Sequence, residues 1–248
     1  MALFRRKQKP LPRETDGWFT FQWHITDECD QRCKHCYIYG DGGSLCPETM
    51  PLEKMEQVVE SCEAFCAGLG VSPVFCLTGG DPLLHPDFWA LAKLLRQKKH
   101  PIVILGNPYH LTPGVCRRLK RMGVMRYQLS IDGMEETHDW FRRPGSWRET
   151  LERIPMLKKA GIDTVVMTTV SSRNMDELPG VVDAVVEAGA DLYAFARYCP
   201  TAADGTNGIT PGAYRQLLYT MGKKFHGLIE SGCKTRFSKK DHLWALYD

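Results

Sequence analysis

The sequence lacks long apolar runs and has no marked excess of charge of either sign. A membrane-spanning helix needs about 20 apolar residues, whereas apolar runs such as residues 102–105 are far shorter. The first seventeen residues are basic and continue into proline and acidic residues, without the apolar core of a secretory signal. The 32 basic residues nearly balance the 29 acidic ones, so the charge does not indicate nucleic-acid or membrane binding. We therefore expect a cytoplasmic protein with no nucleic-acid partner and no membrane partner.

Low-complexity segments and close internal repeats are also missing. The 43% of hydrophobic and 25% of charged residues are ordinary for a globular protein. A chain of 248 residues can bury a substantial core in one α/β domain or in two small ones. Ten cysteines are many for a chain that begins without a signal peptide. This number favours metal or redox chemistry over disulfides.

Apolar, β-prone runs alternate with helical segments along most of the chain. We expect strands at residues 19–26, 74–78, 102–105, 125–130, 164–170 and 191–197. Helices are expected near residues 52–69, 86–98, 147–160, 175–188 and 210–231, and another opens at Thr112-Pro113. Such alternation is typical of a parallel sheet covered by helices. The sequence thus predicts an α/β fold, a partial (β/α)6 TIM-like barrel with parallel strands.

The composition suggests three regions. We expect a flexible N-terminal tail at residues 1–17, a core domain at residues 18–205 and a C-terminal helical extension at residues 206–248. The last residues begin an amphipathic pattern that presents Leu243, Trp244 and Leu246. Either this pattern leads into a further domain of a longer protein, or it packs back on the barrel.

Three cysteines lie within eight residues directly after the first expected strand. Cys29, Cys33 and Cys36 have the spacing Cys-x3-Cys-x2-Cys, and iron–sulfur clusters are held by cysteine thiolates. Three thiolates on a four-iron cluster leave one iron open to a substrate. Zinc is the alternative, but it needs a fourth ligand, for which His35 and Cys46 are available.

This cysteine spacing, followed by Tyr37, resembles the signature of the radical S-adenosylmethionine (SAM) superfamily. The resemblance covers about residues 18–205. It implies that Cys29, Cys33 and Cys36 hold a 4Fe–4S cluster. It also implies that this cluster, once reduced, cleaves SAM to methionine and a 5′-deoxyadenosyl radical. An electron donor such as ferredoxin or flavodoxin is then a partner.

A glycine-rich turn after the second expected strand supports the resemblance. Gly79, Gly80, Asp81 and Pro82 resemble the Gly-Gly-Glu-Pro motif that holds the amino group of SAM in this family, with aspartate in place of glutamate. Glycines let the backbone approach a ligand closely, and a carboxylate accepts hydrogen bonds from an ammonium group. Taken alone, the same tetrapeptide is an ordinary turn.

Residues at the ends of the last three expected strands complete the SAM site that the resemblance implies. Ser130 and Asp132 project from one face and are candidates to bond the ribose hydroxyls. Val170 is expected to pack on adenine, Asn174 to bond nearby, and Arg197 to bind the SAM carboxylate or ribose. An Asp-Gly turn and an exposed, ion-paired arginine are the structural alternatives for Asp132 and Arg197.

Five of the remaining cysteines divide into two groups. Packing in the core is the better interpretation for Cys62, Cys66, Cys76 and Cys116. Cys199 follows the sixth strand, at the face where substrate is expected, and is a candidate to contact the substrate or a further cluster. No other catalytic residue is assigned.

Within the superfamily, these motifs resemble most the radical SAM/SPASM maturases, which modify ribosomally made peptides. Asp139, Arg142 and Arg143 lie in a stretch that is similar to a segment of those enzymes and are expected at the substrate mouth or as solvated charges. The auxiliary-cluster domain of many maturases has no matching cysteine array here. The resemblance implies a peptide or protein substrate and a thioether or other cross-link. Two alternatives stay open, namely a radical SAM enzyme that acts on a small molecule in cofactor biosynthesis and a non-catalytic zinc-binding module.

Overall fold

The fold is a parallel α/β arrangement, seen in a computed structural model that describes residues 17–39, 49–199, 208–238, 240, 241, 243 and 244. Seven strands form one sheet in chain order: β1 (Trp18–Thr26), β2 (Ser72–Gly79), β3 (Ile102–Leu105), β4 (Val124–Ser130), β5 (Asp163–Val170), β6 (Leu192–Arg197) and β7 (Arg236–Ser238). The neighbours in β1–β4 and in β5–β7 pair in parallel. The predicted α/β class is confirmed, and the first six strands begin and end within two residues of the expected positions.

Helices follow most of the strands. They are α1 (Leu52–Leu69), α2 (Phe88–Gln97), α3 (Pro113–Arg121), α4 (Glu135–Phe141), α5 (Ser146–Lys159), α6 (Leu178–Glu187) and α7 (Pro211–Glu230), with short 3-10 turns η2 (Pro82–Leu84) and η3 (Met175–Glu177). The predicted Thr-Pro starts of α3 and α7 are confirmed, because Thr112 and Thr210 each accept a hydrogen bond from a backbone N–H three residues on. None of the helices described is long and apolar enough to span a membrane.

Two elements were not predicted. The strand β7 has three residues and lies where a helical extension was expected, and it exists because Arg236, Phe237 and Ser238 pair with β6. The helix α4 has seven residues within a stretch expected to be a loop. Both elements are too short for apolar periodicity to reveal them.

Contacts divide the described residues into two compact units. The first holds β1 to β3, α1 to α3 and most of β4, and the second holds α4, α6, α7, β6, β7 and nearly all of β5. The helix α7, expected to belong to a separate extension, is part of the second unit. The predicted N-terminal tail lies outside the described residues, apart from Gly17.

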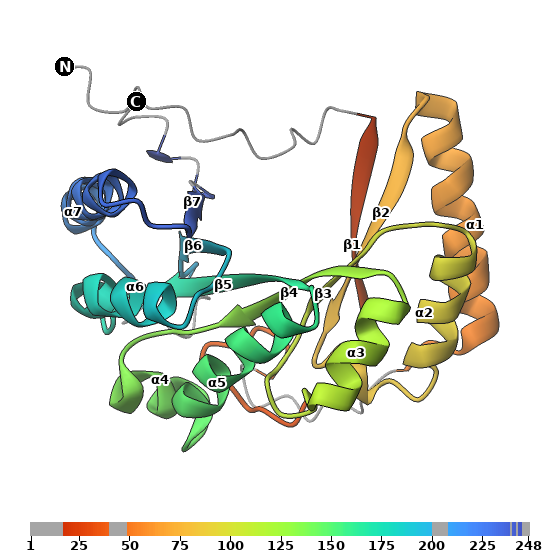
Figure 1. Cartoon of the computed structure of the whole chain (residues 1–248), viewed down its shortest axis with the longest axis horizontal. Coiled ribbons are helices and arrows are strands. Elements are labelled where there is room, and N and C mark those ends of the chain that lie inside the picture. Colours follow the sequence, from red (N-terminus) through yellow and green to blue (C-terminus); the bar gives the residue numbers. More distant parts are fainter. Residues whose placement is uncertain (1–16, 40–48, 200–207, 239, 242, 245–248) are drawn as a thin grey trace. The chain divides into compact units, whose positions relative to one another are not determined.

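The core of the first unit lies between the strands and their helices. The helices α1 and α2 contact each other, and α1 contacts β2 (Figure 1). Phe75 and Leu77 of β2 are fully buried, as are Leu91 and Leu95 of α2. These helices fix β1 and β2, and the loops that follow the two strands carry the predicted cysteine and glycine motifs.

The core of the second unit is aromatic and includes the end of the described chain. The helices α6 and α7 pack against each other (Figure 1). Phe225 of α7 stacks on Phe237 of β7 with 4.3 Å between ring centroids. Trp244 is 3% exposed and lies 5.6 Å from the ring of Phe195 in β6. Trp244 is therefore part of the core of the second unit.

Candidate functional site

The loop that follows β1 carries the three predicted cluster ligands in the first unit. Cys29, Cys33 and Cys36 are all partly accessible, and none of them forms a disulfide. The N–H of Cys36 donates to the carbonyl of Cys33 at 3.0 Å, which turns the chain tightly between these two residues. The hydroxyl of Tyr39 donates to the carbonyl of Asp27 and closes the loop on itself. The predicted neighbour Tyr37 is 77% exposed.

Two N–H groups point at the sulfur of Cys29. The backbone N–H of Gln31 lies 3.4 Å from Sγ, and the side-chain Nδ2 of Asn107 lies 3.3 Å from it. Burial raises the pKa of the Cys29 thiol, and these two hydrogen bonds oppose the shift because they favour the thiolate. The raised pKa favours the neutral thiol in the empty protein, and the two N–H groups are the contacts that favour the metal-binding thiolate.

The glycine turn after β2 packs against the cysteine loop. The N–H of Gly80 donates to the carbonyl of Thr26, and the N–H of Asp81 donates to the carbonyl of Glu28, both at 2.7 Å. A Cβ atom on Gly79 would lie 2.1 Å from the Thr26 oxygen, and one on Gly80 would lie 2.0 Å from the Glu28 oxygen. Only glycine fits at either position. The two glycines thus hold the cysteine loop, a role that the sequence did not indicate.

Asp81 is completely buried and uses one carboxylate oxygen. Its Oδ1 accepts a hydrogen bond from the N–H of Leu83 at 3.0 Å and caps η2, which begins at the buried Pro82. Its Oδ2 is buried and has no hydrogen-bond partner among the residues that the structure describes. Burial raises the pKa of Asp81 to about 6. A buried carboxylate oxygen without a donor is uncommon, and it suits a cationic ligand group such as an ammonium.

Three residues near these motifs were missed by the sequence interpretation. Nδ2 of Asn107 donates to Oδ1 of Asp30 at 2.7 Å, and Nε2 of His110 lies 3.1 Å from Oδ2 of the same carboxylate. The only available signal was their position, because Asn107 and His110 follow the end of β3 as Asp30 and Asp81 follow β1 and β2. Asp30 lies inside the cysteine motif, where the spacing of the thiols is the stronger signal.

The donor set of the first unit fits the cluster better than it fits zinc. Among the described side chains, those close enough to share one ion are Asp30, Asp81 and His110, within 4.8 Å of one another, and the three cysteines form no such group. A single zinc would draw its thiolates together around one ion, whereas in a 4Fe–4S cluster each thiolate binds a different iron. Cys46, the other proposed zinc ligand, lies outside the described residues.

In the second unit, the predicted ribose ligand Asp132 is fully buried and already bonded. Its Oδ1 accepts from the N–H of Thr169 at 2.9 Å, and its Oδ2 accepts from Nε of Arg142 at 2.7 Å. The carboxylate thus links the ends of β4 and β5 to the residue that follows α4. Ser130, the other ribose candidate, is half-buried at the end of β4.

The stretch expected at the substrate mouth forms part of the same framework. The N–H of Asp132 donates to Nδ1 of His138 at 3.0 Å, so Nε2 of this buried histidine carries the proton and faces Oγ of Ser146 at 3.0 Å. Asp139 accepts hydrogen bonds from the N–H groups of Gly145 and Trp147, at the start of α5. Asp139 and Arg142 therefore stabilise the chain around α4 in this structure.

Val170 and Asn174, the predicted adenine contacts, are both fully buried. The two N–H bonds of the Asn174 amide go to the carbonyls of Asp132 at 3.0 Å and Thr169 at 2.9 Å. Its Oδ1 accepts from the N–H of Ser171 at 2.8 Å. A bond from this amide to adenine would have to replace one of these contacts, and the adenine role stays a prediction.

Arg197 at the end of β6 is ion-paired, as the structural alternative expected. Its Nε lies 2.7 Å from Oδ2 of Asp241, which also accepts from the hydroxyl of Tyr214 at 2.9 Å. Burial by itself raises the pKa of Asp241, but the hydrogen bonds from Arg197, the Leu243 N–H and Tyr214 outweigh it and hold this pKa below its usual range. The SAM-binding role of Arg197 stays a prediction. The exposed Cys199 follows two residues later.

We expect Asp241→Asn to lower the free energy of unfolding by about 1.5–3 kcal/mol at pH 7, because charge-assisted hydrogen bonds are lost. Because the pKa of Asp241 is lowered in the folded protein, the stabilisation is fully present above about pH 4. It is lost as the pH falls through the pKa that Asp241 has in the folded state. Urea unfolding at neutral and acid pH measures the difference. Asp176→Asn, at an exposed aspartate, is the control. An Asp241→Asn deficit that persists in acid would contradict the assignment.

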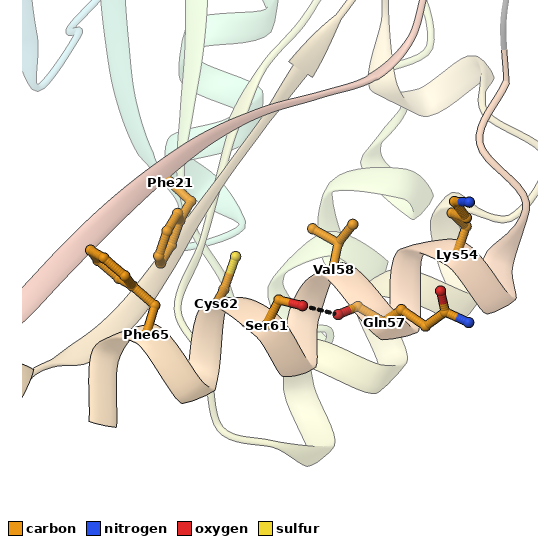
Figure 2. Close-up of a pocket in the computed structure, with 7 residues that line it drawn as sticks. All are labelled: Phe21, Lys54, Gln57, Val58, Ser61, Cys62 and Phe65. Carbon is orange, nitrogen blue, oxygen red and sulfur yellow. Dashed lines mark hydrogen bonds between the residues drawn. The ribbon is translucent and has the colours of Figure 1, made fainter. Parts of the chain in front are cut away.

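A hollow of about 470 Å³ in the first unit shares no residue with these motifs. Figure 2 shows its lining, which is Phe21 of β1 and Lys54, Gln57, Val58, Ser61, Cys62 and Phe65 of α1. The rings of Phe21 and Phe65 lie 6.0 Å apart at one end. Cys62, expected in the core, is half-buried at this hollow, whereas Cys66, Cys76 and Cys116 are buried as predicted. The mainly apolar lining excludes this hollow as the cluster site.

Comparisons with known proteins identify relatives of this chain. The AdoMet-dependent heme synthase of Methanosarcina barkeri is 31% identical over 222 residues, which are 87% of this chain and 62% of that protein. The sporulation killing factor maturation protein SkfB of Bacillus subtilis is 29% identical over 170 residues, 68% of this chain and 40% of that protein. The chain thus spans about half the length of the curated relatives that it matches.

Solved structures share the fold. SuiB of Streptococcus suis, bound to S-adenosylmethionine, matches 92% of this chain and 52% of its own with a TM-score of 0.74 and 13% identity. Native anSMEcpe with bound AdoMet matches 89% of this chain and 64% of its own, also with a TM-score of 0.74, at 16% identity. The family model described as the radical SAM superfamily matches residues 23–185. The chain therefore belongs to the radical SAM superfamily.

Proposed function

We propose that Cys29, Cys33 and Cys36 hold a 4Fe–4S cluster and that Asp81 binds the amino group of SAM beside it. Radical SAM enzymes use this cluster and this cosubstrate, and the reduced cluster supplies the electron that cleaves SAM to methionine and a 5′-deoxyadenosyl radical. The observation that carries the proposal is the buried Oδ2 of Asp81, which has no donor within the described part of the chain. The Gly80 and Asp81 N–H groups hold this residue against the cysteine loop.

The chain's own residues then have three tasks. The cysteine loop presents three thiolates, and the glycine turn after β2 fixes that loop through its two short backbone hydrogen bonds. The Asp81 carboxylate orients the ammonium of the cosubstrate by charge and by hydrogen bonding. In the second unit, Ser130 and Asp132 stay the proposed ribose residues, and both oxygens of Asp132 also accept hydrogen bonds within the protein.

We assign a ribosomally made peptide as the substrate and a thioether or other side-chain cross-link as the product. The support is the cysteine motif, the 29% identity to the SkfB maturation protein and the 25% identity to the mycofactocin maturase MftC of Mycobacterium tuberculosis. Joining a thiol to a carbon removes two hydrogen atoms: the 5′-deoxyadenosyl radical would abstract one from the carbon, the thiol would lose the other as a proton, and the oxidised iron–sulfur cluster would take up the remaining electron. A ferredoxin or flavodoxin is the proposed electron donor.

A small molecule of cofactor biosynthesis is the second candidate. The 31% identity to a heme synthase and the 27% identity to the pre-heme d1 synthase of Dinoroseobacter shibae favour it. Both relatives are named as synthases of heme compounds, so an iron porphyrin is the substrate class to test.

Anaerobic reconstitution with iron and sulfide, followed by reduction in the presence of SAM, tests the proposal. We expect a brown protein and 5′-deoxyadenosine, which chromatography detects. Zinc with no 5′-deoxyadenosine would overturn it. Co-expression with short peptides encoded beside the gene, read by mass spectrometry, should give a peptide lighter by two hydrogen atoms. Consumption of Fe-coproporphyrin with all peptides unchanged would replace the peptide by the second candidate.

A further inference from the structure

The side-chain amide of Asn107 lies between two acceptors. Its Nδ2 is 2.7 Å from Oδ1 of Asp30 and 3.3 Å from Sγ of Cys29. The NH₂ group has two hydrogens, so each hydrogen has one acceptor. This arrangement fixes the orientation of the amide, because the reversed orientation would place its oxygen against a carboxylate and a sulfur. Asn107 is 7% exposed, so water has little access to replace these contacts.

The backbone of Asn107 is held as firmly as its side chain. Its carbonyl accepts a hydrogen bond from the hydroxyl of Tyr127 at 2.9 Å, and this tyrosine of β4 is fully buried. The preceding residue must be glycine, because a Cβ atom on Gly106 would lie 2.4 Å from the same hydroxyl. Nε2 of His110 lies 3.1 Å from the second oxygen of Asp30, without hydrogen-bond geometry. The donor aimed at Cys29 is therefore preorganised.

We propose that Asn107 is a positioning residue that raises the reduction potential of the cluster through its hydrogen bond to the Cys29 thiolate. This inference rests on the proposed cluster. Reduction adds one negative charge to the cluster, and N–H donors to ligand sulfurs stabilise that charge. A neutral amide does this without changing the net charge of the loop. The Gln31 N–H is a second donor to the same sulfur, and as a backbone group it stays in any Asn107 variant.

Redox titration of the reconstituted protein, monitored by electron paramagnetic resonance without SAM, tests the inference. Asn107→Ala removes the donor. We expect about a tenfold smaller ratio of reduced to oxidised cluster at the wild-type midpoint, equivalent to a potential about 59 mV lower for one electron. Asn107→Asp keeps the shape but replaces the donor by an anionic oxygen, so its potential should fall further. Iron and sulfide contents are measured for each sample.

Thr112→Ala is the matched control. It removes another hydrogen bond of the connection between β3 and α3, the one from the Val115 N–H to the Thr112 hydroxyl at 3.2 Å, which involves no cysteine. Its potential should equal that of the wild type. Asn107→Ser keeps a donor on a shorter side chain, so its reduction potential should lie between those of the wild type and Asn107→Ala. This variant replaces Asn107→Ala in the test if Asn107→Ala takes up too little iron. Cluster-loaded Asn107→Ala and Asn107→Asp proteins with the wild-type potential would overturn the role of Asn107. A wild-type protein that takes up no cluster would overturn the proposed function itself.

Discussion

Cys33→Ala is expected to abolish the formation of 5′-deoxyadenosine and to remove most of the cluster. In the proposed cluster each thiolate of the loop would bind its own iron, so the loss of one would leave two ligands for a four-iron cube. Cys33 lies in the middle of the motif and is joined to Cys36 by the backbone hydrogen bond of 3.0 Å. The measurement is the iron and sulfide content after reconstitution, together with the yield of 5′-deoxyadenosine per protein.

Two other cysteines supply the controls. Cys62→Ala changes a half-buried thiol at the hollow beside α1, and Cys199→Ala changes an exposed thiol that follows β6. Both variants should load the cluster and cleave SAM like the wild type. If Cys199→Ala cleaved SAM normally but failed to modify the peptide, this result would support the substrate contact that the position of Cys199 suggests. A Cys33→Ala protein with an undiminished yield of 5′-deoxyadenosine would refute the ligand assignment.

The strands were predictable because their apolar runs record burial directly. Val166 and Tyr193, for example, are fully buried in β5 and β6, in the expected runs. The strand β7 was not predictable, because only three of its residues pair with β6 and a polar stretch precedes them. Its position depends on Phe237, which stacks on Phe225 of α7, a contact that appears only after both elements have folded.

The sequence predicts candidate site residues where residue types and spacing carry the chemistry within one loop. The cysteines and the Gly79–Asp81 turn are such motifs. What the sequence could not give is the choice of partner between distant residues. Asp132 was expected to face a ribose, yet its carboxylate bonds Arg142, and Arg197 pairs with Asp241, which is 44 residues away. Charged side chains at strand ends look alike in sequence whether they face a ligand or each other.

Asp81→Asn is expected to change stability and ligand binding in opposite directions. Burial raises the pKa of Asp81 to about 6 from 3.8, so ionising this carboxyl costs the folded apo-protein free energy. A shift of this size corresponds to at most about 3 kcal/mol. Between pH 3.8 and 6 the folded state binds more protons than the unfolded state, so wild-type stability falls as the pH rises through this range. The asparagine side chain of the variant does not ionise, so the stability of the variant should not fall in this pH range.

The apo variant should therefore be more stable than the wild type above about pH 6 and should match it below about pH 4. The amide oxygen that replaces the Asp81 carboxylate would still accept the Leu83 N–H, so the cap of η2 is kept. Denaturant unfolding of the apo-proteins measures this difference. Asp87→Asn is a suitable control, because Asp87 precedes α2 without a side-chain capping bond. A variant less stable than the wild type at neutral pH would show that the Asp81 charge has a partner.

The same substitution should weaken SAM binding, because the ammonium loses its anionic acceptor. A hydrogen bond to a charged group contributes about 1.5–3 kcal/mol, so the dissociation constant should rise by roughly 10- to 150-fold. Calorimetric titration of the cluster-loaded protein with SAM measures it, and Asp81→Glu, which restores the more usual acid of the family, should bind better than Asp81→Asn. On this proposal, the buried Asp81 carboxylate would destabilise the empty protein and attract the ammonium group of the cosubstrate. Unchanged SAM affinity in a stabilised Asp81→Asn protein would separate the two effects and remove Asp81 from the binding site.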